Sequence, residues 1–321
     1  MSTTTYQETI YAVIDEIKKV IIGKDEIIRQ IFTAILAKGH ILLEDIPGVG
    51  KTTLAMAFSK VLDMNCNRIQ FTPDVMPTDV IGFQILDPVS GKMKYQQGAV
   101  ICNLFLADEI NRTSSKTQSA LLEVMEESRV TVDGVTREVP KPFTVIATQN
   151  PIGSAGTQLL PESQLDRFMI RISMGYPDPS SEVEILKGRS VQNPLDFVTQ
   201  ILNQQELLQM QQEVSEIFVH DAVYEYIARL AQRTRTQELI ELGMSPRGTL
   251  AVTNMAKAFA FLKGRSYLIP DDVKTVFPFT ATHRILLKPK ARVNHVTVSE
   301  IIDGILQEIP APKLIKKRTE S

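Results

Sequence analysis

The residues of this chain whose types and spacing could do chemistry begin with one short run. It reads Asp45-Ile46-Pro47-Gly48-Val49-Gly50-Lys51-Thr52-Thr53. Glycines let successive backbone N–H groups converge on phosphate oxygens, and the N-terminus of a following helix adds partial positive charge. In such a loop a lysine reaches the β- and γ-phosphates of a nucleoside triphosphate such as ATP, and a threonine hydroxyl ligates Mg²⁺. The run therefore predicts that Lys51 and Thr52 hold a triphosphate and its metal, with residues 47–53 wrapped around them.

The flanks of this run support the same interpretation, with one departure. An apolar stretch, 40–44, precedes the run, and a helical stretch, Leu54 to Leu62, follows it, as a strand and a helix do around a phosphate loop. Asp45 stands where the pattern usually has its first glycine. Asp tolerates left-handed backbone better than most residues, but a carboxylate aimed at phosphates would repel them. We therefore expect the Asp45 side chain to face away from the nucleotide.

Acidic and amide side chains follow two further apolar runs. The run 101–107 ends in Asp108 and Glu109, and the run 143–148 ends in Gln149 and Asn150. Such runs are typical of parallel strands covered on both faces, and ligands of open α/β sheets bind at the carboxyl ends of the strands. Asp108 is then expected to hold Mg²⁺, Glu109 to polarise the attacking water as a general base, and Asn150 to hydrogen-bond the γ-phosphate and the water. Taken alone, acids at a strand end are commonly just solvated, and an Asn before a proline is commonly a turn residue; the phosphate loop favours the catalytic interpretation.

Length and composition place limits on the class of protein. A chain of 321 residues predicts two domains with ample buried core. The formal charge of -2 does not suggest a dedicated nucleic-acid binder, which usually shows a basic excess. Cys66 and Cys102 lack metal-type spacing, so we expect two buried thiols of a reducing compartment. With neither a secretion signal nor a run of the ~20 apolar residues that a membrane helix needs, the sequence predicts a cytoplasmic protein without a membrane span.

The rest of the chain predicts an α/β domain followed by a helical one. Helical spacing over residues 6–22 predicts one helix, residues 22–25 break it, and a second helix is expected to follow through Ala37. Core packing is the favoured interpretation of these helices; the alternative is that Ile21, Ile22 and Gly23 form the floor of an adenine pocket. Hairpins are expected near 83–96 and near 129–139, the second turning at Asp-Gly between β-forming residues. We therefore expect a nucleotide-binding αβα domain over 1–176, a helical domain over 177–309 and a basic tail over 310–321.

Several longer segments resemble one known family. They are Leu106-Ala107-Asp108-Glu109-Ile110-Asn111-Arg112, Lys116-Thr117-Gln118-Ser119-Ala120-Leu121-Leu122-Glu123, Ala147-Thr148-Gln149-Asn150-Pro151 and Leu160-Pro161-Glu162-Ser163-Gln164-Leu165-Asp166-Arg167-Phe168. Together with the phosphate loop they resemble the MoxR family of AAA+ ATPases, over nearly the whole chain. Residues 98–101 and 114–115 depart from the family's usual types, which concerns loop shape rather than chemistry. The resemblance implies an AAA+ P-loop αβα core with a parallel sheet, followed by a smaller all-helical lid.

The resemblance also implies a role for each site residue. Lys51 and Thr52 would belong to the Walker A motif, and Asp108 and Glu109 to Walker B. Asn150 would be sensor 1, and Arg247, on the first turn of a helix of the lid, would be sensor 2. Arg167 would be an arginine finger that reaches the γ-phosphate of a neighbouring subunit. A salt bridge with a nearby acid is the alternative interpretation of Arg167. The two hairpins resemble the helix-2 and pre-sensor-1 insertions of related ATPases.

The function implied by the resemblance is Mg²⁺-dependent ATP hydrolysis by a ring, expected to be a hexamer, that acts as a chaperone-like remodeller or maturation factor. Insertion of metals or cofactors, with a partner that carries a von Willebrand factor A domain, is part of that expectation. A DNA-acting AAA+ motor is an alternative, which the lack of basic excess disfavours. A small-molecule kinase or a GTPase switch is another, although the sequence shows neither a guanine-reading Asn-Lys-x-Asp motif nor an acceptor pocket.

Overall fold

The computed structural model describes the chain except residues 1–2, 47, 151–159, 190–192 and 314–321. It divides into two compact units, Met1–Gln212 and Glu213–Ser321. The division falls later than the predicted boundary at 176/177 because residues after 194 pack on the first unit. The backbone N–H groups of Ile201 and Leu202 donate to the Val61 carbonyl at 2.9 and 3.0 Å, and the Gln211 side chain donates to the Ile35 carbonyl at 2.8 Å.

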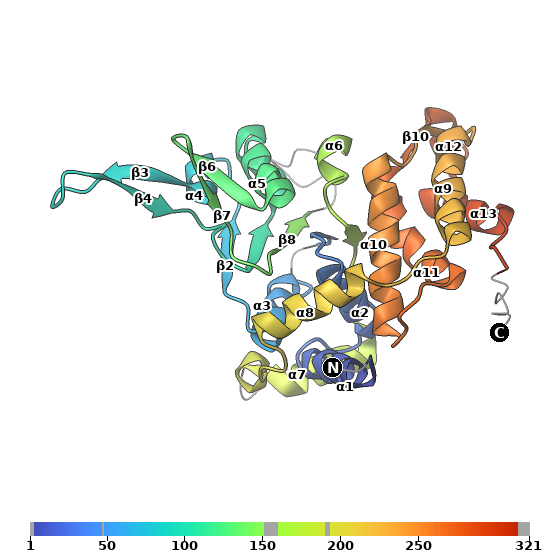
Figure 1. The fold of residues 1–321 in the computed structure, drawn as a ribbon, viewed down its shortest axis with the longest axis horizontal. Coiled ribbons are helices and arrows are strands. Elements are labelled where there is room, and N and C mark those ends of the chain that lie inside the picture. The colour runs from blue at the N-terminus through green and yellow to red at the C-terminus, as the bar shows by residue number, and fades with distance from the viewer. Residues whose placement is uncertain (1–2, 47, 151–159, 190–192, 314–321) are drawn as a thin grey trace, which may run out of the picture. The chain divides into compact units, whose positions relative to one another are not determined.

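A parallel β-sheet organises the described part of the first unit (Figure 1). Its strands lie in the order β2-β5-β8-β1-β9, so β8 pairs with β5 on one side and with β1 on the other. Parallel pairing brings the carboxyl ends of these strands to one edge. The strands span Ile41–Glu44 (β1), Cys66–Gln70 (β2), Leu104–Asp108 (β5), Thr144–Gln149 (β8) and Ile170–Ile172 (β9).

Helices cover both faces of this sheet (Figure 1). Successive strand residues point to opposite faces, and Phe105 and Ala107 of β5 join one buried cluster with Leu121 and Met125 of the helix α5. The helices α2 and α3 lie on the other side of the sheet in Figure 1. The helices of this unit are α1 Thr3–Lys18, α2 Asp25–Leu36, α3 Lys51–Val61, α4 Pro77–Ile81, α5 Ser115–Glu127, α6 Glu162–Leu165 and α7 Pro179–Arg189, with α8 Gln204–Ser215 running on into the second unit.

Local chemistry explains where several of these elements begin. Ser114 caps α5, since its hydroxyl accepts a hydrogen bond from the Thr117 N–H at 3.3 Å. Pro77 begins α4, because proline is tolerated at the first helical position, where its missing N–H costs nothing. In both places a short polar or proline signal decides the boundary.

Two antiparallel hairpins extend the α/β core at the predicted places. One consists of β3 Gly82–Leu86 and β4 Met93–Gln97, and it projects well beyond the sheet (Figure 1). The other consists of β6 Arg129–Val132 and β7 Val135–Glu138. Asp133 and Gly134 between them have φ values of 49° and 75°, the left-handed pair that a tight Asp-Gly turn requires.

The second unit, as far as it is described, is helical apart from one short strand pairing and an isolated bridge between Phe218 and Tyr267. In its described part, β10 Ile240–Leu242 pairs with β11 Leu286–Leu287, and the longest helix, α10 Pro246–Leu262, packs against α11 Pro270–Ala281. Ser245 caps α10 by accepting a hydrogen bond from the Gly248 N–H at 3.0 Å. The remaining helices are α9 Asp221–Thr236, α12 Pro289–Val293 and α13 Val298–Glu308, with 3-10 turns at Ile110–Arg112 and Pro194–Phe197 in the first unit and at Thr282–Arg284 in the second.

Other expectations from composition can be compared with the structure. Both cysteines are free thiols: Cys102 is buried as expected, whereas Cys66 is only partly buried. Burial raises the pKa of the Cys102 thiol to about 12, so it does not act as a thiolate. Over the residues that the structure describes, no helix combines the length and apolar character needed to cross a membrane.

Candidate active site

The phosphate loop leaves the end of β1 and enters α3 at Lys51. Gly48 and Gly50 have φ values of +90° and +95°, a backbone conformation that L side chains rarely adopt. A Cβ built on either glycine meets no atom within 4 Å, so the space beside the loop is open and can take phosphate groups. Pro47, which the sequence analysis also placed in the loop, lies outside the described residues.

Lys51 is held back against the loop that precedes it. Its ammonium group donates to the main-chain carbonyl of Asp45 at 2.7 Å. Burial lowers the pKa of Lys51 because it disfavours the charged form, and the negative charges of Asp45, Asp108 and Glu109 oppose that shift. An anionic ligand at this place would further favour the charged lysine.

The Asp45 side chain faces away from the loop, as predicted. It is buried, with 5% of its surface exposed. Its carboxylate accepts hydrogen bonds from the Ser173 hydroxyl at 2.8 Å, the Gly175 N–H at 3.1 Å and the Met174 N–H. The residue in the place of the usual glycine therefore binds the chain beyond β9 instead of facing a phosphate.

Asp108 and Glu109 lie together at the end of β5. One Asp108 oxygen accepts from the Thr148 hydroxyl at 2.5 Å, and the other accepts from the Arg68 guanidinium at 2.8 Å. The Thr148 hydroxyl also accepts from the Glu109 N–H at 2.9 Å, which ties the two acids to the neighbouring strand β8. Glu109 has left-handed backbone, with φ 56° and ψ 48°.

Both oxygens of the Glu109 carboxylate have partners. The Arg112 guanidinium donates to one at 2.7 Å, and the Asn150 amide donates to the other at 3.2 Å. The structure therefore brings the predicted acid and the predicted amide into direct contact. The Asn150 amide oxygen is buried and has no hydrogen-bond partner among the described residues.

These residues surround a polar pocket of about 320 Å³. Its lining residues are Gly48, Gly50, Lys51, Thr52, Thr53, Arg68, Asp108, Glu109 and Asn150. Thr52 and Asp108 are the predicted metal ligands, and both line it. Within the described ranges no group of three or more His, Cys, Asp or Glu could hold a metal by itself. The two oxygen donors Thr52 and Asp108 fit Mg²⁺, which binds through few protein oxygens and fills the rest of its coordination shell with phosphates and water.

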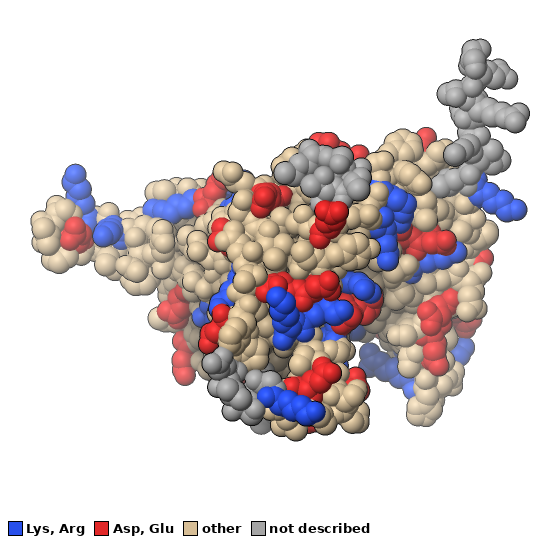
Figure 2. All heavy atoms as spheres, turned by 90° about the horizontal axis from the view of Figure 1, so that it is seen from below, with Lys and Arg blue, Asp and Glu red and all other residues tan. Residues whose placement is uncertain are grey.

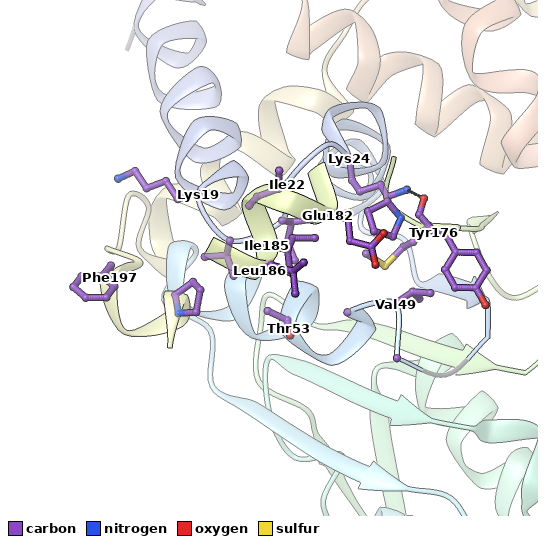
Figure 3. A pocket seen from close by; sticks show the side chains of 17 residues that line it. Lys19, Ile22, Lys24, Val49, Thr53, Tyr176, Glu182, Ile185, Leu186 and Phe197 are labelled. Atoms are coloured by element: carbon purple, nitrogen blue, oxygen red, sulfur yellow. Dashed lines mark hydrogen bonds between the residues drawn. The ribbon is translucent and has the colours of Figure 1, made fainter. Parts of the chain in front are cut away.

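A second, larger pocket lies on the other side of the loop and has a volume of about 560 Å³ (Figure 3). Apolar side chains line much of it: Val20, Ile21, Ile22, Val49, Met174, Pro177, Ile185, Leu186, Pro194 and Phe197. Ile22 is therefore in the pocket, as one of the two interpretations proposed. Gly23 is not among its lining residues. Its φ of +70° and the Ser181 hydroxyl, which lies 2.2 Å from where a Cβ would be, explain the glycine instead.

Arg167 lies away from the phosphate pocket of its own chain. It follows α6, and its Nε is 3.4 Å from a carboxylate oxygen of Glu126 on α5. The two side chains border a separate hollow of about 310 Å³ with Glu123 and Gln164 among its other residues. Arg247 belongs to the second unit, on the first turn of α10. The ion pair between Arg167 and Glu126 matches the alternative interpretation of Arg167, a salt bridge with a nearby acid.

Sequence reasoning missed Arg68, Thr148 and Arg112 as partners of the acids. Arg68 and Thr148 lie on β2 and β8, the strands on either side of β5, and only the strand order shows that they reach Asp108. Arg112 follows Glu109 by three residues and was part of a quoted motif, so the spacing could have indicated the ion pair.

A parallel sheet, a glycine loop that opens a helix, and a lysine that shares a pocket with strand-end acids define a P-loop nucleoside triphosphatase. A model of the ATPase family associated with various cellular activities (AAA) matches residues 40–170, and a model of the AAA lid domain matches residues 232–305. The chain belongs to the MoxR family of AAA+ ATPases. It is therefore a nucleotide-binding ATPase of the AAA+ chaperone-like class.

Individual relatives match nearly the whole chain. The uncharacterized protein YeaC of Bacillus subtilis is 42% identical, over 96% of this chain and 97% of the relative. Chaperone MoxR1 of Mycobacterium tuberculosis is 39% identical, over 95% of this chain and 83% of the relative. A crystal structure from Cytophaga hutchinsonii, of a protein proposed to be an ATPase, superposes with a TM-score of 0.89 at 36% identity and covers 97% of both chains.

Proposed function

We propose that the polar pocket carries out Mg²⁺-dependent hydrolysis of ATP. The observation that carries this proposal is the convergence of Lys51, Asp108, Glu109 and Asn150 on one pocket beside an open glycine loop. The backbone N–H groups of residues 48–53 and the Lys51 ammonium would bind the β- and γ-phosphates. Thr52 and Asp108 would hold Mg²⁺, which neutralises the charge that builds up on the phosphates. Because both Asp108 oxygens already have protein partners, a water-bridged contact to the metal suits this carboxylate best.

Glu109 and Asn150 would position the attacking water. Two carboxylates, those of Asp108 and Glu109, are among the described residues that line the pocket. Because Asp108 is assigned to the metal, Glu109 is the one that can accept a proton from the water. The unpartnered Asn150 oxygen can accept a hydrogen bond from the water while its NH₂ group holds Glu109. Arg112 steadies the other carboxylate oxygen, so the base and the amide act as one unit.

The apolar pocket would take the adenine and ribose of the same nucleotide. Gly48, Val49, Gly50 and Thr53 line it from the loop side, so the two pockets share the loop. Figure 3 shows Ile185 and Leu186 on α7 lying across from Thr53, with Ile22 above them in the view. A flat, weakly polar base is the part of a nucleotide that gains most from such a wall.

Arg167 would complete the site of a neighbouring subunit in a ring, which we expect to be a hexamer. In its own chain it borders a different hollow from the phosphates, and its pairing with Glu126 at 3.4 Å leaves the side chain 30% exposed. An arginine supplied from a neighbour is worth about 10³ to 10⁵ in the rate of phosphoryl transfer. Arg247 would report the nucleotide state to the second unit as sensor 2.

The cycle of ATP hydrolysis would remodel or mature a partner protein, including insertion of a metal or cofactor, with a von Willebrand factor A domain protein as an associate. Support comes from the relative named Chaperone MoxR1 and from the hairpin β3–β4. That hairpin has largely uncharged surface (Figure 2), and Leu86, Val89 and Met93 are 63%, 93% and 59% exposed. Exposed apolar side chains on a projecting element suit contact with another protein.

A subunit-mixing experiment tests the shared site. Lys51→Ala removes nucleotide binding but keeps Arg167, whereas Arg167→Ala keeps the pocket but lacks the finger. Each variant alone should be inactive, and an equal mixture should recover about a quarter of wild-type turnover if subunits exchange at random around a ring. A mixture of Arg167→Ala with the double variant Lys51→Ala/Arg167→Ala is the matched control and should stay inactive. A mixture of the single variants that stays inactive while the two chains co-assemble would contradict the proposal.

A further inference from the structure

The residue in the place of the first loop glycine has more contacts than a phosphate loop needs. We propose that Asp45 is a positioning residue that fixes the wall of the apolar pocket to the phosphate loop, so that the base and the phosphates of one nucleotide are held in register. This inference rests on the proposed nucleotide site and names Asp45 as the residue that couples its two pockets.

Asp45 connects three segments that are distant in the sequence. Its N–H donates to the Gln149 carbonyl at the tip of β8 at 3.2 Å, and its carbonyl accepts from Lys51 at 2.7 Å. Its carboxylate binds residues 173–175, which follow β9. The main chain of this residue thus belongs to the phosphate side, and its side chain reaches the other side of the site.

The segment that the carboxylate holds leads directly into the apolar pocket. Met174, Tyr176 and Pro177 all line that pocket, and Met174 is 4% exposed. The far end of the segment is fixed as well, because the Lys24 ammonium donates to the Tyr176 carbonyl at 2.8 Å (Figure 3). Gly175, whose N–H is one of the donors to Asp45, has a φ of +60°, a turn that glycine adopts without strain. Asp45 is the anchor nearest to the phosphate loop.

A carboxylate fits this role better than the alternatives. Three donors converge on it, and an ionised carboxylate offers acceptors only, on both oxygens. An asparagine would turn one NH₂ group toward an N–H donor, and a glycine would leave the buried Met174 N–H without its partner. Hydrogen bonds to an ionised carboxylate are stronger than neutral ones, so they can hold residues 173–175 firmly in place.

The experiment compares two ligands that differ in what they touch. Inorganic tripolyphosphate contacts only the phosphate side, whereas ADP contacts both sides. For the full-length protein with Asp45→Asn, we expect ADP affinity to fall about tenfold in calorimetric titration, while tripolyphosphate affinity changes less than about twofold. Glu44→Gln is the matched control. Glu44 is the preceding carboxylate, and its hydrogen bond to Gln149 and ion pair with Arg171 do not involve residues 173–175. Its ratio of ADP to tripolyphosphate affinity should equal that of wild type.

A milder variant covers the case in which Asp45→Asn fails to fold. Ser173→Ala removes one of the donors and leaves the two N–H groups in place, so ADP affinity should fall about threefold with tripolyphosphate affinity unchanged. Equal loss of affinity for both ligands, or no loss for either, would overturn the inference. If wild-type protein binds neither ligand, the proposed nucleotide site itself is contradicted. Failure of the Asp45 inference and failure of the nucleotide site are therefore distinguishable.

Discussion

The two pockets on either side of the phosphate loop are built on opposite principles. The polar pocket is lined by charged, hydroxyl and amide side chains and by glycines. The apolar pocket is lined mainly by aliphatic residues, prolines and one phenylalanine. The same loop residues, Gly48, Gly50 and Thr53, border both.

The difference teaches how strictly each half of a ligand constrains the protein. Phosphates, a divalent cation and an attacking water each require a particular donor or acceptor at a particular distance, so few residue types can serve. A base and a sugar require only a surface of the right shape, which many combinations of apolar side chains can provide. Substitutions on the polar side should therefore remove chemistry, and substitutions on the apolar side should only weaken binding.

The largest expected effect is on the polar side. Glu109→Gln keeps the size of the side chain and removes the proton acceptor, so turnover should fall by about 10² to 10⁴ while ATP binding persists. Steady-state hydrolysis and nucleotide titration measure the two quantities separately. Glu8→Gln, an exposed acid on α1, is the control and should match wild type. Loss of binding in parallel with turnover would break the distinction between the two pockets.

The stability of the parallel sheet that carries the phosphate loop can be tested through His40, the residue directly before β1. Its ring accepts from the Val145 N–H at 3.0 Å and contacts the Met125 carbonyl at 2.9 Å. Burial lowers the pKa of His40 to about 4. Between pH 6.5 and 4 the unfolded chain binds the extra proton, so the free energy of unfolding should fall by about 2 kcal/mol from pH 7.5 to pH 5.

Hydrogen exchange over residues 144–149 measures this effect within the first unit. Protection should drop on acidification in wild type and in the exposed-site control His295→Gln, whereas His40→Gln should start less protected and respond less to pH. A pH response identical in all three proteins would assign the effect to other groups. If ligand binding in both pockets weakens together at pH 5, the cause lies in the sheet that both pockets share. Such a result would distinguish loss of the sheet's stability from loss of a catalytic group.

Arg68 should have an intermediate effect that depends on the metal. Its guanidinium neutralises Asp108 at 2.8 Å, so Arg68→Gln leaves that carboxylate free to repel phosphates. ADP affinity should then fall about tenfold without Mg²⁺ and recover in part when Mg²⁺ takes over the charge of Asp108. Titrations with and without Mg²⁺ give the two values, with Arg129→Gln, an exposed arginine of β6, as the control. An equal loss in both conditions would contradict the pairing as the cause.

The smallest effect is expected on the apolar side. Leu186 on α7 is 68% exposed and lines the pocket, so Leu186→Ser should weaken ADP binding about fivefold, from the loss of ~1 kcal/mol of buried apolar contact, and leave tripolyphosphate binding unchanged. Val183→Ser is the matched control, because it lies on the same helix with 48% exposure and does not line the pocket. A larger fall in turnover than in ADP binding would mean that the apolar side contributes to chemistry after all.

The same contrast explains what could be predicted from the sequence. The fold class and the polar residues Lys51, Asp108, Glu109 and Asn150 were accessible because each follows an apolar strand run, and strand ends meet at one edge. Thr148 and Arg68 were not, because their roles depend on which strands are neighbours, and the order β2-β5-β8-β1-β9 does not follow the sequence.

The apolar pocket was largely hidden for a related reason. It is assembled from the connection after α1, the segment after β9 and the helix α7, and ordinary aliphatic residues there look like core. The predicted linker at 175–181 contains the start of α7, and residues through 212 stay with the first unit. The possible adenine floor of Ile21, Ile22 and Gly23 pointed toward this side, and the first two of these residues line the pocket.

The left-handed backbone of Glu109 makes the position of this acid depend on its neighbours. A non-glycine residue in that region sits about 1 kcal/mol or more above its relaxed state, and only its surroundings keep it there. Rotating that peptide unit would relieve this strain and would move the Glu109 carboxylate. The hydrogen bond that the Glu109 N–H donates to the Thr148 hydroxyl opposes such a rotation, so a hydroxyl one strand away holds this acid in place.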